Sequence, residues 1–233
     1  MNYPDEISRL KSTYTERDRS PEILELWQPF NPVSQYYRQT QEREFVIMVR
    51  KLGINIQNAK ILDVGCGFGS LMRFLYTLGT PGDQLFGFDL MELRVDKAKT
   101  GSPASVTIMA GDAQNIPFPN QSFDLVTQFT LFSSIFEPGL RVKIAAEIER
   151  VLRPGGFLVW YDMSKIQSIH TRCISYSEII QLFPNLTPIY TKKLHNIKAS
   201  YFARKSFLLC EIFDSFPLIN KSHVLCALQK NVV

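Results

Sequence analysis

The sequence lacks the features that mark secreted, membrane-spanning and metal-binding proteins. Its four cysteines lie far apart, without a Cys-x-x-Cys pair, which disfavours a disulfide framework and a metal site. No stretch reaches the roughly 18 consecutive apolar residues of a transmembrane helix, and the start, MNYPDEISRLK, has no apolar core of signal-peptide length. We therefore expect a cytoplasmic protein with no metal ion and no transmembrane segment.

Concentrated charge is also missing. The net charge is only +4, and the Lys and Arg residues are dispersed along the chain, so there is no dense basic stripe of the kind that binds nucleic acid. With 233 residues, 45% of them hydrophobic, the chain can bury one sizeable core. We expect one domain with a short addition, a small-molecule partner and no nucleic acid. The composition leaves the oligomeric state open.

Strand-like and helix-like segments alternate along most of the chain, which predicts an α/β fold with a doubly wound, mostly parallel sheet. Apolar periodicity before the RPGG break predicts a helix over 140–152, and the capping box of Ser175 and Glu178 predicts another over 176–183. We expect seven strands in this sheet. The last two would pair antiparallel at one edge, so that the last strand runs against the direction of the others. The predicted strands are residues 60–64, 84–90, 105–110, 123–129, 156–162, 187–194 and 223–230.

The residues before this alternation predict a helical arm. Asn31 and Pro32 are good helix-starting residues, apolar side chains then recur on one helical face, and Gly53 can end the helix. An arm of this kind commonly packs across the carboxyl edge of an open α/β sheet, where ligands bind. We therefore expect residues 1–55 to form an N-terminal helical arm or lid over a domain of residues 56–233.

The stretch ILDVGCGFGS, residues 61–70, joins a buried strand to a helix through glycines at every second position. Gly65, Gly67 and Gly69 let the chain turn sharply and let a ligand approach the backbone, and Asp63 places a carboxylate just before the loop. No lysine follows, as a phosphate-binding P-loop requires, and the spacing is not the G-x-G-x-x-G of dinucleotide sites. Nucleoside triphosphates and nicotinamide cofactors are therefore disfavoured, and a tight turn without a ligand is the alternative.

The pattern DVGCGFG resembles motif I of the class I S-adenosylmethionine-dependent methyltransferases, and three later segments continue the resemblance in the family's order. LFGFDL ends in the acidic Asp89, GDAQNIPFPNQSFDLV carries Asp112 before the next strand, and RVLRPGGFLVWYD is similar to the family's helix, turn and strand. The resemblance covers residues 60–162. It implies a Rossmann-like fold and S-adenosyl-L-methionine as the cofactor.

The resemblance also assigns residues to the cofactor. It implies that Asp89 accepts hydrogen bonds from both ribose hydroxyls and that Asp112 meets the adenine amino group. It also implies that an arm tyrosine closes over the cofactor: of Tyr36 and Tyr37 we expect one to do so and the other to pack in the core, and we assign Tyr36 to the cofactor. Asp63 would contact the ammonium group directly or through water. Asp89 and Asp112 each have a plainer interpretation, as a helix cap and a turn residue. The predicted cofactor-binding residues are Tyr36, Asp63, Gly65, Cys66, Gly67, Gly69, Asp89, Leu90, Asp112, Ala113 and Gln128.

Catalytic residues are harder to predict, because a sulfonium methyl group needs only alignment with a nucleophile unless that nucleophile begins protonated. Asp162, at the end of LVWYD, and His170, in the loop that follows, are the predicted catalytic residues, each as a proton acceptor. A turn aspartate and a solvated histidine are the alternatives. His195 and His223 lie in or beside strand candidates and are predicted to be structural.

The resemblance implies an enzyme that transfers a methyl group from S-adenosylmethionine to an oxygen or nitrogen of a small molecule, such as a natural product, glycan or glycolipid. A peptide or protein carboxylate is an alternative acceptor, and a non-catalytic S-adenosylmethionine-binding protein is an alternative class. The acceptor side would be the arm and the variable residues 162–223. Within them, the apolar segment 201–216 would form an acceptor pocket or lid, bind a lipid surface or, as the default, cover the sheet.

Overall fold

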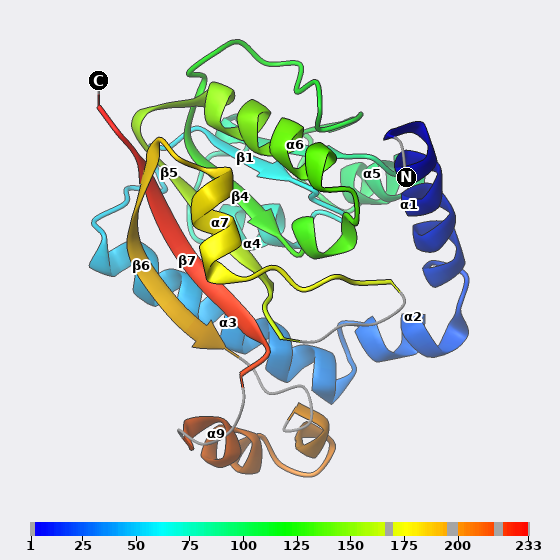
Figure 1. The fold of residues 1–233 in the computed structure, drawn as a ribbon. Helices are drawn as coiled ribbons and strands as arrows, with labels where there is room; N and C mark the ends of the chain where they lie inside the picture. The colour runs from blue at the N-terminus through cyan, green and yellow to red at the C-terminus, as the bar shows by residue number, and fades with distance from the viewer. Residues whose placement is uncertain (1–2, 166–169, 195–199, 217–220, 233) are drawn as a thin grey trace.

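A computed structural model describes residues 3–165, 170–194, 200–216 and 221–232. Its strands are β1 Ile61–Val64, β2 Leu85–Asp89, β3 Thr107–Ala110, β4 Phe123–Phe129, β5 Leu152–Met163, β6 Leu186–Leu194 and β7 His223–Lys230. They form one seven-stranded sheet in the order β3-β2-β1-β4-β5-β7-β6 (Figure 1). The predicted α/β fold is confirmed, whereas His195 lies outside the described residues.

The sheet is parallel except for one strand. β1 pairs in parallel with β2 and β4, β2 with β3, and β4 with β5, whereas β7 runs antiparallel to both β5 and β6. The prediction that the last strand alone is antiparallel is confirmed. Because β1 lies between β2 and β4, the strand order reverses there, and such a reversal leaves a crevice at the carboxyl ends of the strands.

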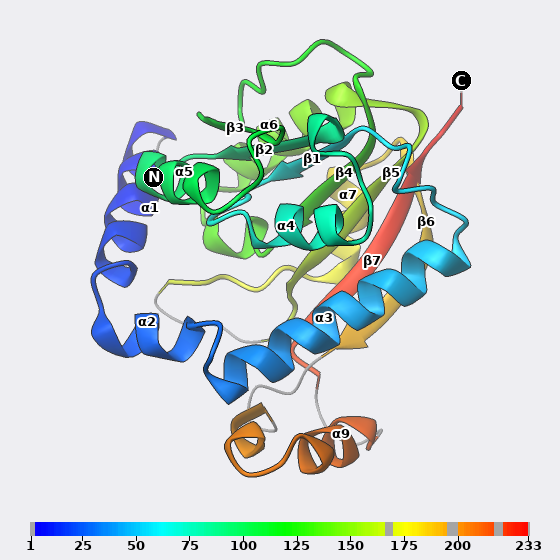
Figure 2. The ribbon, with the colours of Figure 1, turned by 180° about the vertical axis from the view of Figure 1, so that it is seen from behind.

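Helices cover both faces of this sheet. The described helices are α1 Tyr3–Arg17, α2 Pro21–Trp27, α3 Pro32–Lys51, α4 Ser70–Thr77, α5 Glu92–Thr100, α6 Pro138–Val151, α7 Tyr176–Leu182 and α9 Phe207–Ser215, with 3-10 turns η1 Gly82–Gln84, η2 Phe132–Ser134 and η3 Tyr201–Arg204. α6 and α7 lie on the face seen in Figure 1, and α3 and α4 lie on the face seen in Figure 2. None of the described helices is both long and apolar enough to cross a membrane.

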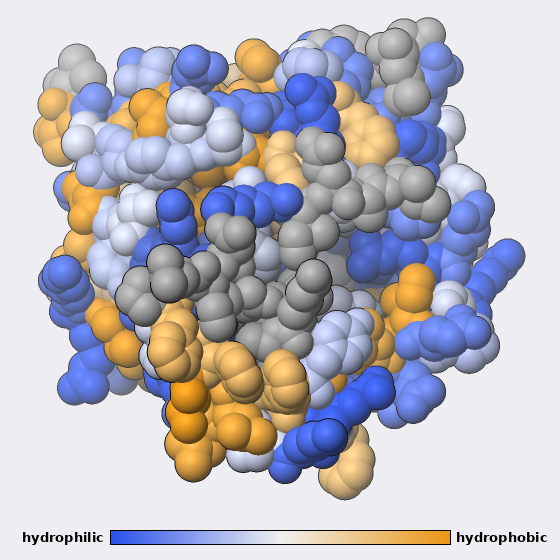
Figure 3. All heavy atoms as spheres, turned by 60° about the horizontal axis from the view of Figure 1, so that its bottom comes forward, coloured by the Kyte–Doolittle hydropathy of each residue, from blue (hydrophilic) through white to orange (hydrophobic). Residues whose placement is uncertain are grey.

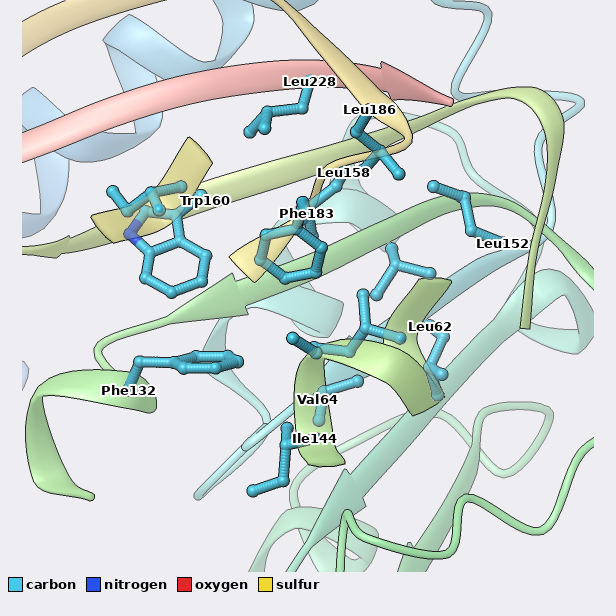
Figure 4. Close-up of a cluster of buried hydrophobic side chains, with 14 of the residues drawn as sticks. Leu62, Val64, Phe132, Ile144, Leu152, Leu158, Trp160, Phe183, Leu186 and Leu228 are labelled. Carbon is cyan, nitrogen blue, oxygen red and sulfur yellow. The ribbon is translucent and has the colours of Figure 1, made fainter. Parts of the chain in front are cut away.

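The core has one layer on each face of the sheet, because side chains alternate along the strands. Leu62 and Val64 of β1 belong to the layer under α6 and α7, together with Ile144, Trp160 and Phe183 (Figure 4). The second layer lies under α3 and α4. Asp63, which lies between Leu62 and Val64, therefore points to the opposite face of the sheet, the face that α3 covers.

Local sequence signals set several element boundaries. β4 and β7 have the predicted bounds, and α7 ends one residue earlier than predicted. Ser175 Oγ accepts a hydrogen bond from the Glu178 N–H at 3.1 Å, as a capping box requires. The Glu178 carboxylate, however, turns to Arg141 Nη1 at 2.5 Å. Arg141 is buried and needs a counter-charge, so an ion pair replaces half of the capping box.

The N-terminal arm contains three helices, whereas the sequence predicted only α3. The start and stop signals of α3 are confirmed, because Asn31 Oδ1 accepts a hydrogen bond from the Val33 N–H at 3.0 Å and Gly53 follows the helix with a φ of 65°. Among its described side chains α1 buries only Glu6 and Leu10, and α2 buries none. Hydrophobic periodicity could not find helices that use so few core positions.

η3 and α9 form a small lobe against α3, apart from the sheet (Figures 1 and 2). The Tyr36 hydroxyl of α3 donates to Asp214 Oδ2 at 3.0 Å, and Cys210 and Ala203 pack against Tyr36. The default expectation that residues 201–216 cover the sheet is therefore wrong. α3 already covers that face, where Phe45 belongs to the core layer, so the segment packs on the helix instead.

Candidate active site

A cleft of about 830 Å³ opens at the carboxyl ends of the parallel strands, where the strand order reverses. α1, α2 and α3 contribute one wall, and the loops after β1, β2 and β4 contribute the other. Gly65, Cys66 and Gly67 of the glycine loop line this cleft together with Asp63 and Asp89, whereas Gly69, also predicted to bind the cofactor, is not among the described lining residues. The structure thus brings the loop and its two nearest acidic residues to one cavity of a size that accommodates a small-molecule ligand.

The glycine loop has a backbone conformation that side chains disfavour. Gly65, Gly67 and Gly69 have φ values of 78°, 52° and 73°. The Gly65 N–H donates to the Phe88 carbonyl at 2.7 Å, which ties the loop to the end of β2. A Cβ on Gly67 would meet no heavy atom within 4 Å, so this stretch of backbone faces the open cleft. The loop leads into α4, whose first N–H groups favour an anionic group.

Asp89, at the end of β2, fastens the glycine loop and also borders the cleft. Its Oδ2 accepts a hydrogen bond from the Gly67 N–H at 2.8 Å, and its Oδ1 accepts one from the Met91 N–H at 2.9 Å. Burial raises the pKa of the Asp89 carboxyl, against the opposing effects of these hydrogen bonds and of Arg94. Each carboxylate oxygen has two lone pairs, so Asp89 can cap the turn and still accept a hydrogen bond from a ligand.

Asp63 is a buried carboxyl that lines the cleft. Its Oδ1 accepts a hydrogen bond from the Thr127 hydroxyl at 2.8 Å. Burial, partly offset by this bond and reinforced by Asp89, raises the pKa of Asp63 to about 7. A cation in the cleft would stabilise the ionised form. Burial also raises the pKa of the neighbouring Cys66, so its thiol lines the cleft without the thiolate character of a nucleophile.

Leu90, Asp112 and Ala113 lie along the same cleft, beyond the ends of β2 and β3. Asp112 accepts hydrogen bonds from the Gln114 backbone N–H at 3.0 Å and from the Gln114 side-chain amide at 2.8 Å. The aspartate therefore forms a local turn while it borders the cleft. Its assignment to the adenine amino group stays a prediction, as do the roles of the other two residues.

Gln128 and Tyr36, both predicted to bind the cofactor, are not among the described residues that line the cleft. Gln128 is buried, and its Oε1 accepts a hydrogen bond from the Leu131 N–H at 3.1 Å. Its Nε2 has no hydrogen-bond partner among the described residues. Tyr36 points to the η3–α9 lobe, where it binds Asp214. Side chains alternate in direction along a strand and rotate around a helix, and at the positions of Gln128 in β4 and Tyr36 in α3 they point away from the cleft wall.

The two predicted catalytic residues lie in different surroundings. His170 lines the cleft. Asp162 is fully buried and is not among the described lining residues; its Oδ2 accepts a hydrogen bond from the Ser133 N–H at 3.1 Å, and its Oδ1 accepts one from the Met163 N–H at 2.8 Å. Burial, opposed by these bonds, raises the pKa of Asp162 to about 6. Its contacts are those of an anchor between β5 and η2.

Tyr37, Tyr161 and His223 form a hydrogen-bonded chain on the cleft wall that the sequence did not predict. The Tyr161 hydroxyl donates to Tyr37 Oη at 2.8 Å, and Tyr37 Oη lies 2.5 Å from His223 Nε2. His223 Nδ1 in turn lies 2.8 Å from Ser222 Oγ. Burial raises the pKa of both tyrosines, so both phenols stay neutral at ordinary pH. The sequence did contain one signal for this chain. Neighbouring side chains of a strand point to opposite faces of the sheet, so Tyr161 must face the side opposite to Asp162.

Aromatic rings surround this chain. The Tyr161 and His223 rings stack with centroids 5.2 Å apart, Trp27 packs edge-on against Tyr37 at 5.6 Å, and Phe129 packs against Tyr161 at 5.3 Å. All five rings line the cleft. A wall of this kind favours a ligand with an apolar or aromatic portion.

The cleft residues fit S-adenosylmethionine by their chemistry. Asp63 offers a buried carboxylate to an ammonium group, the start of α4 offers N–H groups to a carboxylate, and Asp89 offers acceptors to ribose hydroxyls. Within the described ranges, no three His, Cys, Asp or Glu side chains gather in a way that could hold a metal ion. That the protein uses no metal stays a prediction.

Comparison with known sequences points to the same chemistry. Residues 61–156 match the family described as "Methyltransferase domain". The demethylmenaquinone methyltransferase of Staphylococcus aureus (strain JH9) is 33% identical over 120 residues, which are 51% of this chain and 48% of that protein. The chain therefore spans about half the length of the curated relatives it matches.

Solved structures share the fold over more of the chain. A putative sarcosine dimethylglycine methyltransferase from Galdieria sulphuraria has a TM-score of 0.64 at 15% identity, covering 96% of this chain and 98% of its own. The [4+2]-cyclase SpnF has a TM-score of 0.63 at 15% identity, covering 84% and 83%. At these identities the likeness shows the fold alone, and one fold hosts several chemistries. Residues 61–156 thus match a methyltransferase-domain family, and the chain shares its fold with class I, Rossmann-like methyltransferases that are described as S-adenosylmethionine-dependent.

Proposed function

We propose that this chain transfers a methyl group from S-adenosylmethionine to an oxygen or nitrogen of a small molecule with an apolar or aromatic portion. Asp63 carries the proposal. Its carboxyl is buried at the cleft, with a pKa raised to about 7 by that burial. A carboxylate is costly there without a cation, and the ammonium group of the methyl donor supplies one.

S-adenosylmethionine supplies a methyl group that a positively charged sulfur already activates. The chain's own part is to hold donor and acceptor in line and to exclude water. In this proposal Asp63 binds the ammonium group, and the N–H groups at the start of α4 bind the carboxylate. Asp89 accepts hydrogen bonds from the ribose hydroxyls, and Asp112 and Ala113 lie beside the adenine.

The aromatic wall supports the acceptor class. Trp27, Tyr37, Phe129 and Tyr161 line the cleft and pack on one another. The Staphylococcus aureus relative is named for demethylmenaquinone, a quinone, and flat rings pack well against aromatic side chains. We therefore favour an aromatic or quinone-like natural product over a glycan as the acceptor.

A proton acceptor is needed only if the nucleophile begins protonated. His170 lines the cleft, and so does His223, which Tyr37 connects to the Tyr161 hydroxyl. We propose these two histidines as the proton acceptors. Asp162, the other residue that the sequence favoured, already accepts two backbone hydrogen bonds and ranks behind them.

Calorimetric titration with S-adenosylmethionine, S-adenosylhomocysteine and NAD tests the cofactor. Binding of both adenosyl ligands without binding of NAD supports the proposal, and binding of NAD alone overturns it. Asp89→Ala should weaken adenosyl binding about tenfold or more, because bonds to a charged acceptor are lost. Asp83→Ala, which removes an exposed aspartate, is the matched control.

Turnover separates an enzyme from a protein that only binds the cofactor. The protein would be incubated with methyl-labelled S-adenosylmethionine and a panel of phenols, quinols, amines and peptides. Label on a phenol, quinol oxygen or amine supports the proposal. Label on peptide carboxylates alone favours the alternative acceptor, and tight cofactor binding without transfer to any acceptor favours a non-catalytic binding protein.

A further inference from the structure

The outer face of the η3–α9 lobe, residues 200–216, carries exposed apolar side chains. Leu208 and Phe216 keep 65% and 52% of their surface exposed, although residues of these types are usually buried. Figure 3 shows a cluster of hydrophobic side chains, in orange, at the lower left of the view. The exposed apolar side chains of the lobe include Phe202, Leu208, Leu209, Ile212, Phe213 and Phe216.

The inner face of the lobe is fixed to α3. Cys210 is fully buried beside Tyr36, whose ring packs on Phe207 with centroids 5.9 Å apart. Arg43 Nη1 of α3 lies 2.8 Å from Glu211 Oε1. Because these contacts fix the rotation of α9 about its axis, the apolar face is presented outward.

Uncompensated positive charge borders this apolar face. Arg204 and Lys205 are exposed at the end of η3, and neither has an acidic partner in the part of the chain that the structure describes. The two acidic residues of the lobe, Glu211 and Asp214, are both paired with basic side chains. An apolar helix face flanked by cations that have no acidic partner among the described residues complements an anionic lipid surface.

The lobe also borders the cleft. Ser200 and Tyr201 line the cleft, and Tyr201 remains exposed at its rim. Across the opening, Leu24 and Trp27 of α2 line the cleft and are likewise exposed. Exposed apolar side chains therefore continue from the lobe to the rim of the proposed acceptor site.

We propose that the η3–α9 lobe is a docking surface for an anionic lipid membrane. Its apolar side chains enter the headgroup region, while Arg204 and Lys205 meet the lipid phosphates. A second copy of this chain fits less well, because a two-fold contact would bring together the unpaired cations of both copies. Docking does not depend on methyl transfer. Its consequence, that an amphiphilic acceptor enters the cleft from the bilayer, rests on the proposed function.

Vesicle flotation tests the docking. Vesicles of phosphatidylcholine with phosphatidylglycerol should carry the protein, and vesicles of phosphatidylcholine alone should carry roughly tenfold less, since each basic residue adds to binding at an anionic surface. Leu208→Ser combined with Ile212→Ser should lower partitioning about tenfold or more, because two apolar side chains no longer leave water.

A matched variant controls for hydrophobicity alone. Leu93→Ser with Val142→Ser removes comparably exposed apolar side chains, 69% and 58% exposed, from α5 and α6, which lie away from the lobe in Figures 1 and 2. This control should float like the unchanged protein. Arg204→Glu with Lys205→Glu should abolish the preference for anionic vesicles.

Distinct results overturn the proposal. The proposal is wrong if the protein does not float with anionic vesicles. It is also wrong if the Leu208→Ser, Ile212→Ser variant floats as well as the unchanged protein. A concentration-dependent dimer in sedimentation equilibrium that this variant abolishes would assign the face to a second copy instead. Titration with S-adenosylhomocysteine keeps the two proposals apart, because neither Leu208 nor Ile212 lines the cleft and the variant should bind that ligand with unchanged affinity.

Discussion

Asp63 owes its position to strand alternation. It follows Leu62, which faces the core under α6, so its own side chain turns to the opposite side, where Thr127 of β4 donates to it. Burial and the neighbouring Asp89 raise its pKa, against the effect of Thr127. An acid at this site destabilises the ligand-free fold when ionised and favours a cationic ligand, which is a common arrangement for binding residues.

Asp63→Asn should weaken S-adenosylmethionine binding about tenfold or more above neutral pH, because an amide cannot neutralise an ammonium group. The unchanged protein should bind more tightly as the pH rises through about 7, where Asp63 ionises, and the variant should lose this dependence. Calorimetry across that pH range measures both. Identical pH dependence in the two proteins would remove Asp63 from the ammonium site.

The same substitution has an opposite effect on the ligand-free fold. The folded pKa of Asp63 lies above its unfolded value, so the folded state binds its proton more tightly and loses stability as the pH rises from about 4 to about 7. Asp63→Asn should therefore raise Tm at alkaline pH in the absence of ligand, while Thr127 keeps its acceptor.

Asp162→Asn distinguishes an anchor from a base. An amide would turn its NH₂ group toward the N–H of Ser133 or Met163 and lose one of two hydrogen bonds. We expect a loss of stability of about 1–3 kcal/mol, with the affinity for S-adenosylmethionine little changed. Denaturant unfolding measures the loss. Unchanged stability combined with abolished transfer would instead make Asp162 catalytic.

Tyr37→Phe tests the hydrogen-bonded chain on the cleft wall. It removes the oxygen between Tyr161 and His223, so methyl transfer to a protonated acceptor should slow by roughly 10² or more, as for loss of acid–base catalysis. Cofactor affinity should stay close to that of the unchanged protein. Tyr36→Phe, which removes the neighbouring hydroxyl that binds Asp214, is the matched control. Equal rates for both variants would exclude the chain from catalysis.

At the scale of elements, α1 is anchored at both ends across the cleft. Near its start the buried Glu6 accepts a hydrogen bond from the Phe136 N–H at 2.5 Å, and Arg9 donates to the Ser134 carbonyl at 2.6 Å. Just past its end, Asp18 binds Arg94 of α5 through two bonds, at 2.6 and 2.8 Å. We propose that residues 1–55 act as a lid, because ligand entry beneath α1 would require these anchors to open.

Asp18→Asn should loosen this lid. The Asp18–Arg94 pair is only partly exposed, and the loss of an ion pair of this kind costs up to about 1 kcal/mol. S-adenosylhomocysteine should therefore dissociate a fewfold faster, as measured by stopped-flow fluorescence. Glu25→Gln, on the exposed side of α2, should leave the rate unchanged. A rate that Asp18→Asn does not alter would contradict the lid.

At the scale of the whole molecule, the cleft draws on the arm, the central sheet and β7, so ligand binding should stabilise the entire domain. Saturation with S-adenosylhomocysteine at about 100 times Kd should add about 2.7 kcal/mol, which corresponds to roughly 5–10 °C in Tm for a domain of this size. Differential scanning calorimetry measures the shift. Asp89→Ala should reduce it, and an equal shift with NAD would contradict the cofactor assignment.

Much of the fold and of the cofactor side of the site could be predicted from sequence. The boundaries of β4 and β7 and the caps of α3 depend on short-range alternation and on single residues such as Asn31 and Gly53. α1 and α2 escaped prediction, because they bury too few side chains to show a period. The η3–α9 lobe was misplaced, since its apolar side chains suggested burial but point outward.

The sequence by itself determined the β1–glycine–α4 unit and the cleft position of Asp63 and Asp89, because neighbours along the chain set a turn and a strand end. Only the tertiary structure decided which remaining side chains reach the cleft. Tyr37 meets Tyr161 and His223, which lie 124 and 186 positions away in the sequence. Contacts over such separations depend on how helices and strands pack, and the local pattern around each residue carries no record of them.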